Sequence, residues 1–142
     1  MFTAKDIMTR DVLTVNPETR IGEAVETMLK HKVSGLPVVD DEMNLTGILS
    51  ETDVVGLIYD RGSMETKEVR HFMTERATSF DEDDSLVDIC DFLAKNVFRR
   101  VPITSEGKVV GLISIPDILQ YTVTLNEEGP RASRTEQEAA TP

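Results

Sequence analysis

Cysteine is almost absent from this 142-residue sequence, which contains only Cys90. A single cysteine cannot form an internal disulfide, so the sequence favours a reducing compartment and we expect a cytoplasmic protein. Cys90 stands at helical spacing with Leu86, Ile89 and Leu93. We therefore predict that Cys90 is a buried core thiol rather than a nucleophile or a metal ligand.

Histidine is also scarce. His31 and His71 have no cysteine or second histidine nearby at metal-ligand spacing, so we predict no metal site and place both at the surface near the ends of elements. The acidic run at residues 81–84 precedes a helical pattern. We interpret it as a solvated segment that complements the helix dipole rather than as a metal site.

Long apolar runs and an excess of basic residues are missing as well. No apolar stretch approaches the length of a membrane span, and the first residues lack the basic start and apolar block of a signal peptide. The net charge is −11. Nucleic acid and anionic membranes need clustered Lys and Arg, so neither is an expected partner. A small anion still fits if a few cations gather locally.

An internal repeat is the main feature of what is present. Gly47-Ile-Leu-Ser50-Glu-Thr-Asp53 recurs as Gly111-Leu-Ile-Ser114-Ile-Pro-Asp117. Units of about 60 residues would be marginal alone, so the two copies should share one core. The predicted organisation is a first repeat at residues 1–62, a second at 63–125 and a disordered tail at 126–142, which has almost no apolar content.

Both repeats predict the order strand, helix, strand, strand, helix from their apolar spacing. In the first repeat, the apolar stripe of the first helix runs from Ile21 to Leu29, and Val54, Leu57 and Ile58 should point inward from the second. A tight turn is expected at Glu106-Gly107. The remaining expected elements are strands at 11–15, 36–39 and 45–49 and a helix at 52–59, followed by strands at 77–80, 101–104 and 109–113 and helices at 85–95 and 116–124.

The repeated Ser-x-x-Asp segment has two interpretations. A strand that runs into a helix at a serine offers a hydroxyl and free amides to a phosphate, and the aspartate three residues later suits the diol of a ribose. Alternatively, the same pattern is a capping box that needs no ligand. Its duplication in matched context favours binding.

Three kinds of segment point to one family: the openings Asp6-Ile-Met-Thr9 and His71-Phe-Met-Thr74, the segment Val33-Ser-Gly-Leu-Pro-Val-Val39, and both Gly-x-x-Ser-x-x-Asp segments. Together they resemble the CBS (cystathionine-β-synthase-type) domain in the tandem pair called a Bateman module. The resemblance covers about residues 4–124. It implies an α/β (α+β) fold of two βαββα repeats about a pseudo-twofold axis, with the sheets packed together and the helices outside. It also implies a module without catalytic activity that binds AMP, ADP, ATP or S-adenosylmethionine between the repeats, commonly forms dimers and regulates another protein.

The resemblance further assigns residues to two clefts. In the main cleft, Ser114 and Arg99 would contact phosphate and Asp117 the ribose, with Arg100 next to Arg99 and open to exchange with it. Ser34 and Gly35 stand where the arginines would be in the first repeat, so the Asp117 cleft should bind phosphate better. The adenine of the main cleft would be held by Thr14, Val33, Ser34 and Gly35, and the weaker second cleft would be formed by Ser50, Asp53, Thr78 and Phe98.

We therefore expect a regulatory module for which an adenine nucleotide is a signal rather than a cofactor. Its expected partners are a second copy of the chain in a homodimer and a regulated protein that the sequence does not identify. The alternatives are a structural or dimerisation module with no bound nucleotide and a sensor of S-adenosylmethionine.

Overall fold

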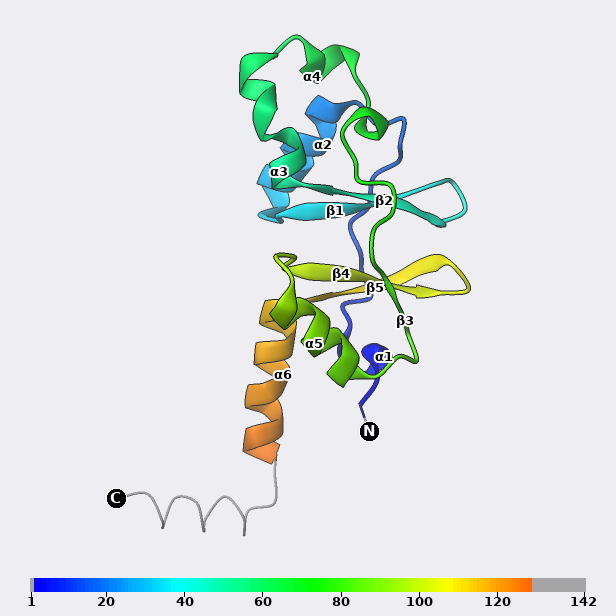
Figure 1. Cartoon of the computed structure of the whole chain (residues 1–142), viewed down its shortest axis with the longest axis vertical. Helices are drawn as coiled ribbons and strands as arrows, with labels where there is room; N and C mark the ends of the chain where they lie inside the picture. The colour runs from blue at the N-terminus through cyan, green and yellow to red at the C-terminus, as the bar shows by residue number, and fades with distance from the viewer. Residues whose placement is uncertain (1, 129–142) are drawn as a thin grey trace, which may run out of the picture.

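The computed structural model describes residues 2–128 of the chain. Two halves are stacked along the long axis, each with a β-hairpin facing the other half and helices on the far side (Figure 1). This is the expected arrangement of two repeats with their sheets inside and their helices outside.

The first half is built on an antiparallel hairpin of β1 and β2. The strand predicted at residues 11–15 does not form, because only Val15 makes a bridge, parallel to Val38. The elements are α2 (Ile21–His31), β1 (Gly35–Val39), β2 (Leu45–Ser50), α3 (Glu51–Val54) and the 3₁₀ segment η1 (Val55–Tyr59), followed by α4 (Ser63–Thr66) and η2 (Val69–His71).

The second half has a three-stranded sheet in which β3 is parallel to β4 and β4 is antiparallel to β5. The two-residue turn predicted at Glu106-Gly107 is confirmed, since both residues have positive φ, as a tight hairpin turn requires. The elements are β3 (Phe80–Asp81), α5 (Leu86–Lys95), β4 (Arg100–Ser105), β5 (Lys108–Ser114) and α6 (Ile115–Glu128). The short N-terminal helix α1 (Ala4–Ile7), which the apolar pattern did not predict, packs on this half.

The final helix is longer than its apolar pattern predicted. Helix α6 continues to Glu128, so the prediction that residues 126–128 belong to a disordered tail is wrong. The apolar pattern placed the end of this helix too early because Asn126, Glu127 and Glu128 are polar. The rest of the tail, residues 129–142, lies outside the described residues.

The opening segment of each repeat packs on the core of the other repeat. Ala4 and Met8 are buried with Ile89, Ile103 and Ile113 of the second half. Val69 is buried in the first half, where it contacts the core that contains Ile21, Leu36 and Leu49. Hydrogen bonds of 2.9 Å link Thr9 to Leu112, and bonds of 2.9 and 3.0 Å link Thr74 to Ile48. The two repeats are therefore held together by exchanged segments as well as by facing sheets.

The glycine of each Gly-x-x-Ser-x-x-Asp segment is required by this exchange. A Cβ atom on Gly47 would lie 2.6 Å from the Thr74 carbonyl oxygen and 3.2 Å from the Met73 sulfur. On Gly111, the same atom would overlap the side chain of Met8. In both cases the opening segment of the other repeat passes over the glycine.

Three burial predictions from helical spacing are wrong. Leu29 is 74% exposed, because it lies at the margin of the α2 stripe. Ile58 is 69% exposed, because the chain after α3 becomes a 3₁₀ segment in which the 3.6-residue period no longer applies. Cys90 is half-buried on the flank of α5, where partial burial and then Asp91 raise the pKa of its thiol.

The predicted surface positions of the two histidines are confirmed. His31 and His71 are both exposed at the ends of helical segments. Over residues 2–128, no helix combines the length and apolar character needed to cross a membrane.

Replacing Gly47 or Gly111 with alanine should destabilise the protein by about 1 to 3 kcal/mol, because the added methyl group forces the packed segments apart. Gly47→Ala should cost more, since its nearest neighbour is backbone rather than a flexible side chain. Gly56→Ala is the matched control, as no atom lies within 4 Å of its new Cβ. Urea unfolding of the three variants measures the difference, and equal stabilities would contradict the role of the crossing segments.

Candidate ligand-binding clefts

Two clefts related by the repeat lie where the halves meet. The Ser50 cleft, of about 240 Å³, is lined by Ser34, Gly35, Ile48, Ser50, Glu51, Thr52, Thr74, Val97, Phe98, Arg99 and Arg100. The Ser114 cleft, of about 230 Å³, is lined by Thr9, Asp11, Val12, Leu13, Val33, Gly35, Leu36, Arg100, Leu112, Ser114 and Asp117. Both halves contribute to each cleft, so neither site exists in one repeat alone.

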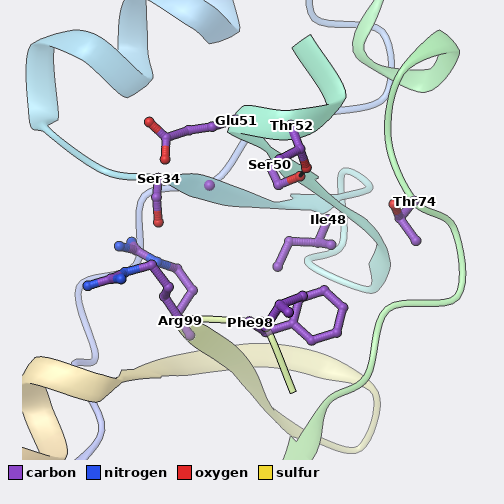
Figure 2. A pocket seen from close by; sticks show the side chains of 11 residues that line it. Ser34, Ile48, Ser50, Glu51, Thr52, Thr74, Phe98 and Arg99 are labelled. Carbon is purple, nitrogen blue, oxygen red and sulfur yellow. Dashed lines mark hydrogen bonds between the residues drawn. The ribbon is translucent and has the colours of Figure 1, made fainter. Parts of the chain in front are cut away.

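The Ser50 cleft has a polar part and an apolar part (Figure 2). On the polar side, Ser34 and Glu51 face the guanidinium group of Arg99 across the opening. Ile48 and the ring of Phe98 lie further along the same cleft. A third, smaller cavity of about 50 Å³ continues past Phe98, where the ring stacks on Phe92 with the centroids 5.9 Å apart.

Both Ser-x-x-Asp segments form capping boxes. The backbone N–H of Ser50 donates to Asp53 Oδ2 at 2.9 Å, and Ser114 N–H donates to Asp117 Oδ2 at 2.9 Å. In the first repeat the Ser50 hydroxyl also donates to Asp53 Oδ2 at 2.9 Å, while in the second the Asp117 N–H donates to Ser114 Oγ at 3.2 Å. Capping is therefore one established role of the motif, and any ligand role would come in addition to it.

The two capped helices differ in length. Helix α6 has 14 residues, whereas α3 has four before the chain changes to a 3₁₀ segment, so the helix predicted at 52–59 is only partly α-helical. A helix dipole develops with length and acts at the first turn. The Ser114 cleft therefore receives a substantial helix N-terminus, while attraction of an anion to the Ser50 cleft depends on its arginines.

The position of Arg99 corrects the sequence assignment. Arg99 lines the Ser50 cleft and not the cleft that contains Asp117. The reason is strand register: Arg100 lies directly opposite Ser114 on β5, so Arg100 is the arginine of the Ser114 cleft. Arg99 precedes the strand, and its carbonyl accepts a 2.9 Å hydrogen bond from Ile115 N–H while its side chain enters the other cleft. The first repeat supplies no arginine to the Ser50 cleft, as expected, but Arg99 of the second repeat does.

Arg100 lines both clefts and the third cavity. Its Nε atom is buried and has no hydrogen-bond partner among the described residues. Burial lowers the pKa of the guanidinium, and neighbouring Arg99 lowers it further, whereas the Asp117 and Glu51 carboxylates raise it. A partly desolvated cation with an unused donor is costly by itself and well suited to an anion that enters from either cleft.

The other predicted site residues are distributed unequally. Val33 and Gly35 line the Ser114 cleft as expected for the main site, but Ser34 lines the Ser50 cleft and Thr14 lines neither. Of the residues assigned to the second cleft, Ser50 and Phe98 line it. Thr78 lines the adjoining small cavity, and Asp53 reaches the cleft only through its bonds to Ser50.

Several residues that line the clefts were not predicted from the sequence. Thr9 and Thr74 line the Ser114 and Ser50 clefts respectively, and their place in the two repeated openings was the signal for them. Glu51 and Thr52 lie inside the repeated motif at positions that the capping pattern leaves unspecified. Nothing in apolar spacing marks them.

Comparison with known proteins identifies a family. The CBS domain model matches residues 4–60 and 69–124. The chain is 32% identical to protein MJ1225 of Methanocaldococcus jannaschii, over 82% of this chain but 41% of that protein, so it spans less than half of this relative. It is 31% identical to the CBS domain-containing protein YhcV of Bacillus subtilis, over 83% of this chain and 84% of YhcV. A crystal structure of CBSX2 in complex with AMP matches with a TM-score of 0.80 and 27% identity, covering 88% of this chain and 98% of CBSX2, a protein from Arabidopsis thaliana.

Replacing Arg100 with methionine should leave the free energy of unfolding unchanged or raise it by about 1 kcal/mol, because the variant removes a buried donor for which residues 2–128 offer no partner. Arg61→Met, at an exposed position outside the clefts, is the control and should change stability by less than about 0.5 kcal/mol. Denaturant unfolding of both variants provides the measurement. A loss of more than about 1 kcal/mol in Arg100→Met alone would show that Arg100 is a structural residue.

Proposed function

Because the chain belongs to the CBS domain family, we propose that it is a non-catalytic regulatory module that binds an adenine nucleotide at the junction of its two repeats and passes this occupancy to a partner protein. The observation that carries the proposal is the Ser50 cleft, which is lined by several hydroxyl groups and two arginines, one of them with a buried donor that has no partner in the described part of the chain. CBSX2, which has the same fold, has been solved with AMP.

The polar part of the Ser50 cleft suits a phosphate group. Arg99 and Arg100 supply charge-assisted donors, each typically contributing about 1.5 to 3 kcal/mol. The Ser34 hydroxyl lines the same space and can donate to a phosphate oxygen. The hydroxyls of Ser50 and Thr52 line it too, but the Ser50 hydroxyl already donates to Asp53 Oδ2 and lies 3.0 Å from the Thr52 hydroxyl. This arrangement reverses the order of the clefts expected from the sequence, and we now propose that the Ser50 cleft binds phosphate more tightly than the Ser114 cleft.

The apolar part suits a purine base. Ile48 and Phe98 line the cleft beside the polar groups, and aromatic stacking contributes about 1 to 3 kcal/mol per base where a base and a ring meet. Thr78, in the small cavity behind Phe98, offers a hydroxyl to the edge of the base. The phosphate donors and the apolar wall line the same cleft, so a single nucleotide could contact both.

The Ser114 cleft is proposed as the weaker site. It shares Arg100, adds the N-terminus of α6 and has Asp117 in its lining, where the carboxylate would accept from a ribose diol. It also contains the acidic side chain of Asp11, which opposes an anion. Val33 and Leu13 supply its apolar contacts.

A homodimer is part of the proposal. Several large apolar side chains are exposed on η1 and α6, on the side of each half away from the facing sheets. They are Val55, Ile58, Tyr59, Leu119 and Val123. Tyr59 is 92% exposed, and large apolar side chains exposed on both halves favour association with a second copy.

We also propose a cytoplasmic location, because a single cysteine cannot form an internal disulfide.

Calorimetric titration with AMP, ADP, ATP and S-adenosylmethionine tests the function. We expect at least one adenine nucleotide to bind. At 100 times its dissociation constant, that nucleotide should raise the free energy of unfolding by about 2.7 kcal/mol. Arg99→Ala should weaken the tighter site about ten- to a hundredfold, since it removes a charge-assisted bond. Asp117→Ala should leave that site nearly unchanged.

Arg61→Ala is the control for the loss of one positive charge. Two results would count against the proposal: no nucleotide binding by the wild-type protein, which would favour a purely structural module, or loss of the tighter site in Asp117→Ala but not in Arg99→Ala. Tighter binding of S-adenosylmethionine than of any nucleotide would change the ligand class.

Sedimentation velocity tests the dimer. We expect the wild-type chain to be dimeric at tens of micromolar, and Tyr59→Glu to shift it towards monomer because it places a charge in the apolar contact. Glu26→Gln, at another exposed helical position, should not change the sedimentation coefficient. A wild-type protein that is monomeric under these conditions would refute this part of the proposal.

A further inference from the structure

Glu51 is an acidic residue in a cleft that otherwise attracts anions. Its carboxylate faces the arginine side of the Ser50 cleft (Figure 2). A 3.0 Å hydrogen bond from Glu51 N–H to the Ser34 carbonyl fixes its backbone at the end of β2. Over residues 2–128 the side-chain ion pairs are Lys5–Asp83 and Arg70–Glu68, so Glu51 is not neutralised by direct contact with an arginine.

The repeat shows that helix capping does not require this carboxylate. The position that corresponds to Glu51 in the second repeat is Ile115, which also follows the capping serine and also donates its N–H to the residue at the start of the hairpin, Arg99. Ile115 packs against the core of the second half. Both capping boxes are completed by Asp53 and Asp117 instead. The acid is therefore particular to the Ser50 cleft.

The charges in the cleft limit what it can hold. Among the lining residues, two guanidinium groups and one carboxylate give a formal charge of +1 (+2 from Arg99 and Arg100, −1 from Glu51). Asp53, bonded to Ser50 behind the lining, and Asp117, close to Arg100, add further negative charge nearby. A phosphate monoester carries about −1.5 to −2 at neutral pH, which the two arginines can compensate. Each added phosphate group brings more negative charge without a further cation from this cleft, and like charges repel, with solvent screening part of the effect at the exposed Glu51.

We propose that Glu51 is a specificity-determining residue that makes the Ser50 cleft select a nucleoside monophosphate over a nucleoside triphosphate. The inference rests on the proposed nucleotide-binding function and names the ligand class within it. The ordinary alternative is that Glu51 only complements the short α3 helix, in which case its removal would alter stability but not the preference between ligands.

The test compares dissociation constants of AMP, ADP and ATP for the wild-type protein and Glu51→Gln by calorimetry in buffer free of divalent cations. We expect the wild type to bind AMP more tightly than ATP, and Glu51→Gln to reduce this preference about three- to tenfold, mainly by tighter binding of ATP. Glu51→Lys should shift the ratio further in the same direction. Glu26→Gln, with the same change in net charge outside the cleft, should leave the ratio unchanged.

The outcomes separate the two levels of the account. If nucleotides bind but Glu51→Gln has the wild-type ratio of AMP to ATP affinity, the inference about Glu51 is overturned while the proposed function stands. An equal shift in Glu26→Gln would also overturn it, because the effect would then reflect total charge. If no nucleotide binds the wild type, the proposed function fails and the inference about Glu51 fails with it.

Discussion

The exchange of opening segments between the repeats is the contact on which both clefts depend. Thr9 forms backbone hydrogen bonds with Leu112, and Thr74 forms them with Ile48. These four residues are also cleft residues, because Thr9 and Leu112 line the Ser114 cleft while Thr74 and Ile48 line the Ser50 cleft. The residues that join the two halves therefore also line the two clefts. A ligand in either cleft would touch both halves and favour the joined state.

The pseudo-twofold arrangement produces two sites of similar shape and different chemistry. The Ser50 cleft is lined by Arg99 and Glu51, whereas neither of their counterparts in the repeat, Ser34 and Ile115, lines the Ser114 cleft. Arg100 is common to both. Because its guanidinium is partly desolvated and its Nε has no partner within residues 2–128, we expect it to add little to stability and to contribute most when an anion is present. Divergence at a few positions has therefore separated the electrostatics of two copies of one scaffold.

Much of the fold could be predicted from the sequence, because most elements occur in both repeats and their apolar patterns could be compared. The hairpins and the Glu106-Gly107 turn agree with the apolar pattern and turn chemistry. The clefts were less predictable, since a repeat alignment pairs positions along the chain and does not tell which half a side chain faces. Arg99 was assigned to the wrong cleft for that reason, and Glu51 was missed because its neighbours alone gave no reason to single it out.

A crystal structure of the protein with AMP tests the central claim most directly. The account predicts that the phosphate lies within hydrogen-bonding distance of Arg99 and Arg100 in the Ser50 cleft, with the adenine against Ile48 and Phe98. It also predicts that the segments around Thr9 and Thr74 keep their places. A phosphate bound only beside Ser114 and Asp117, or clefts that remain empty at saturating AMP, would contradict it.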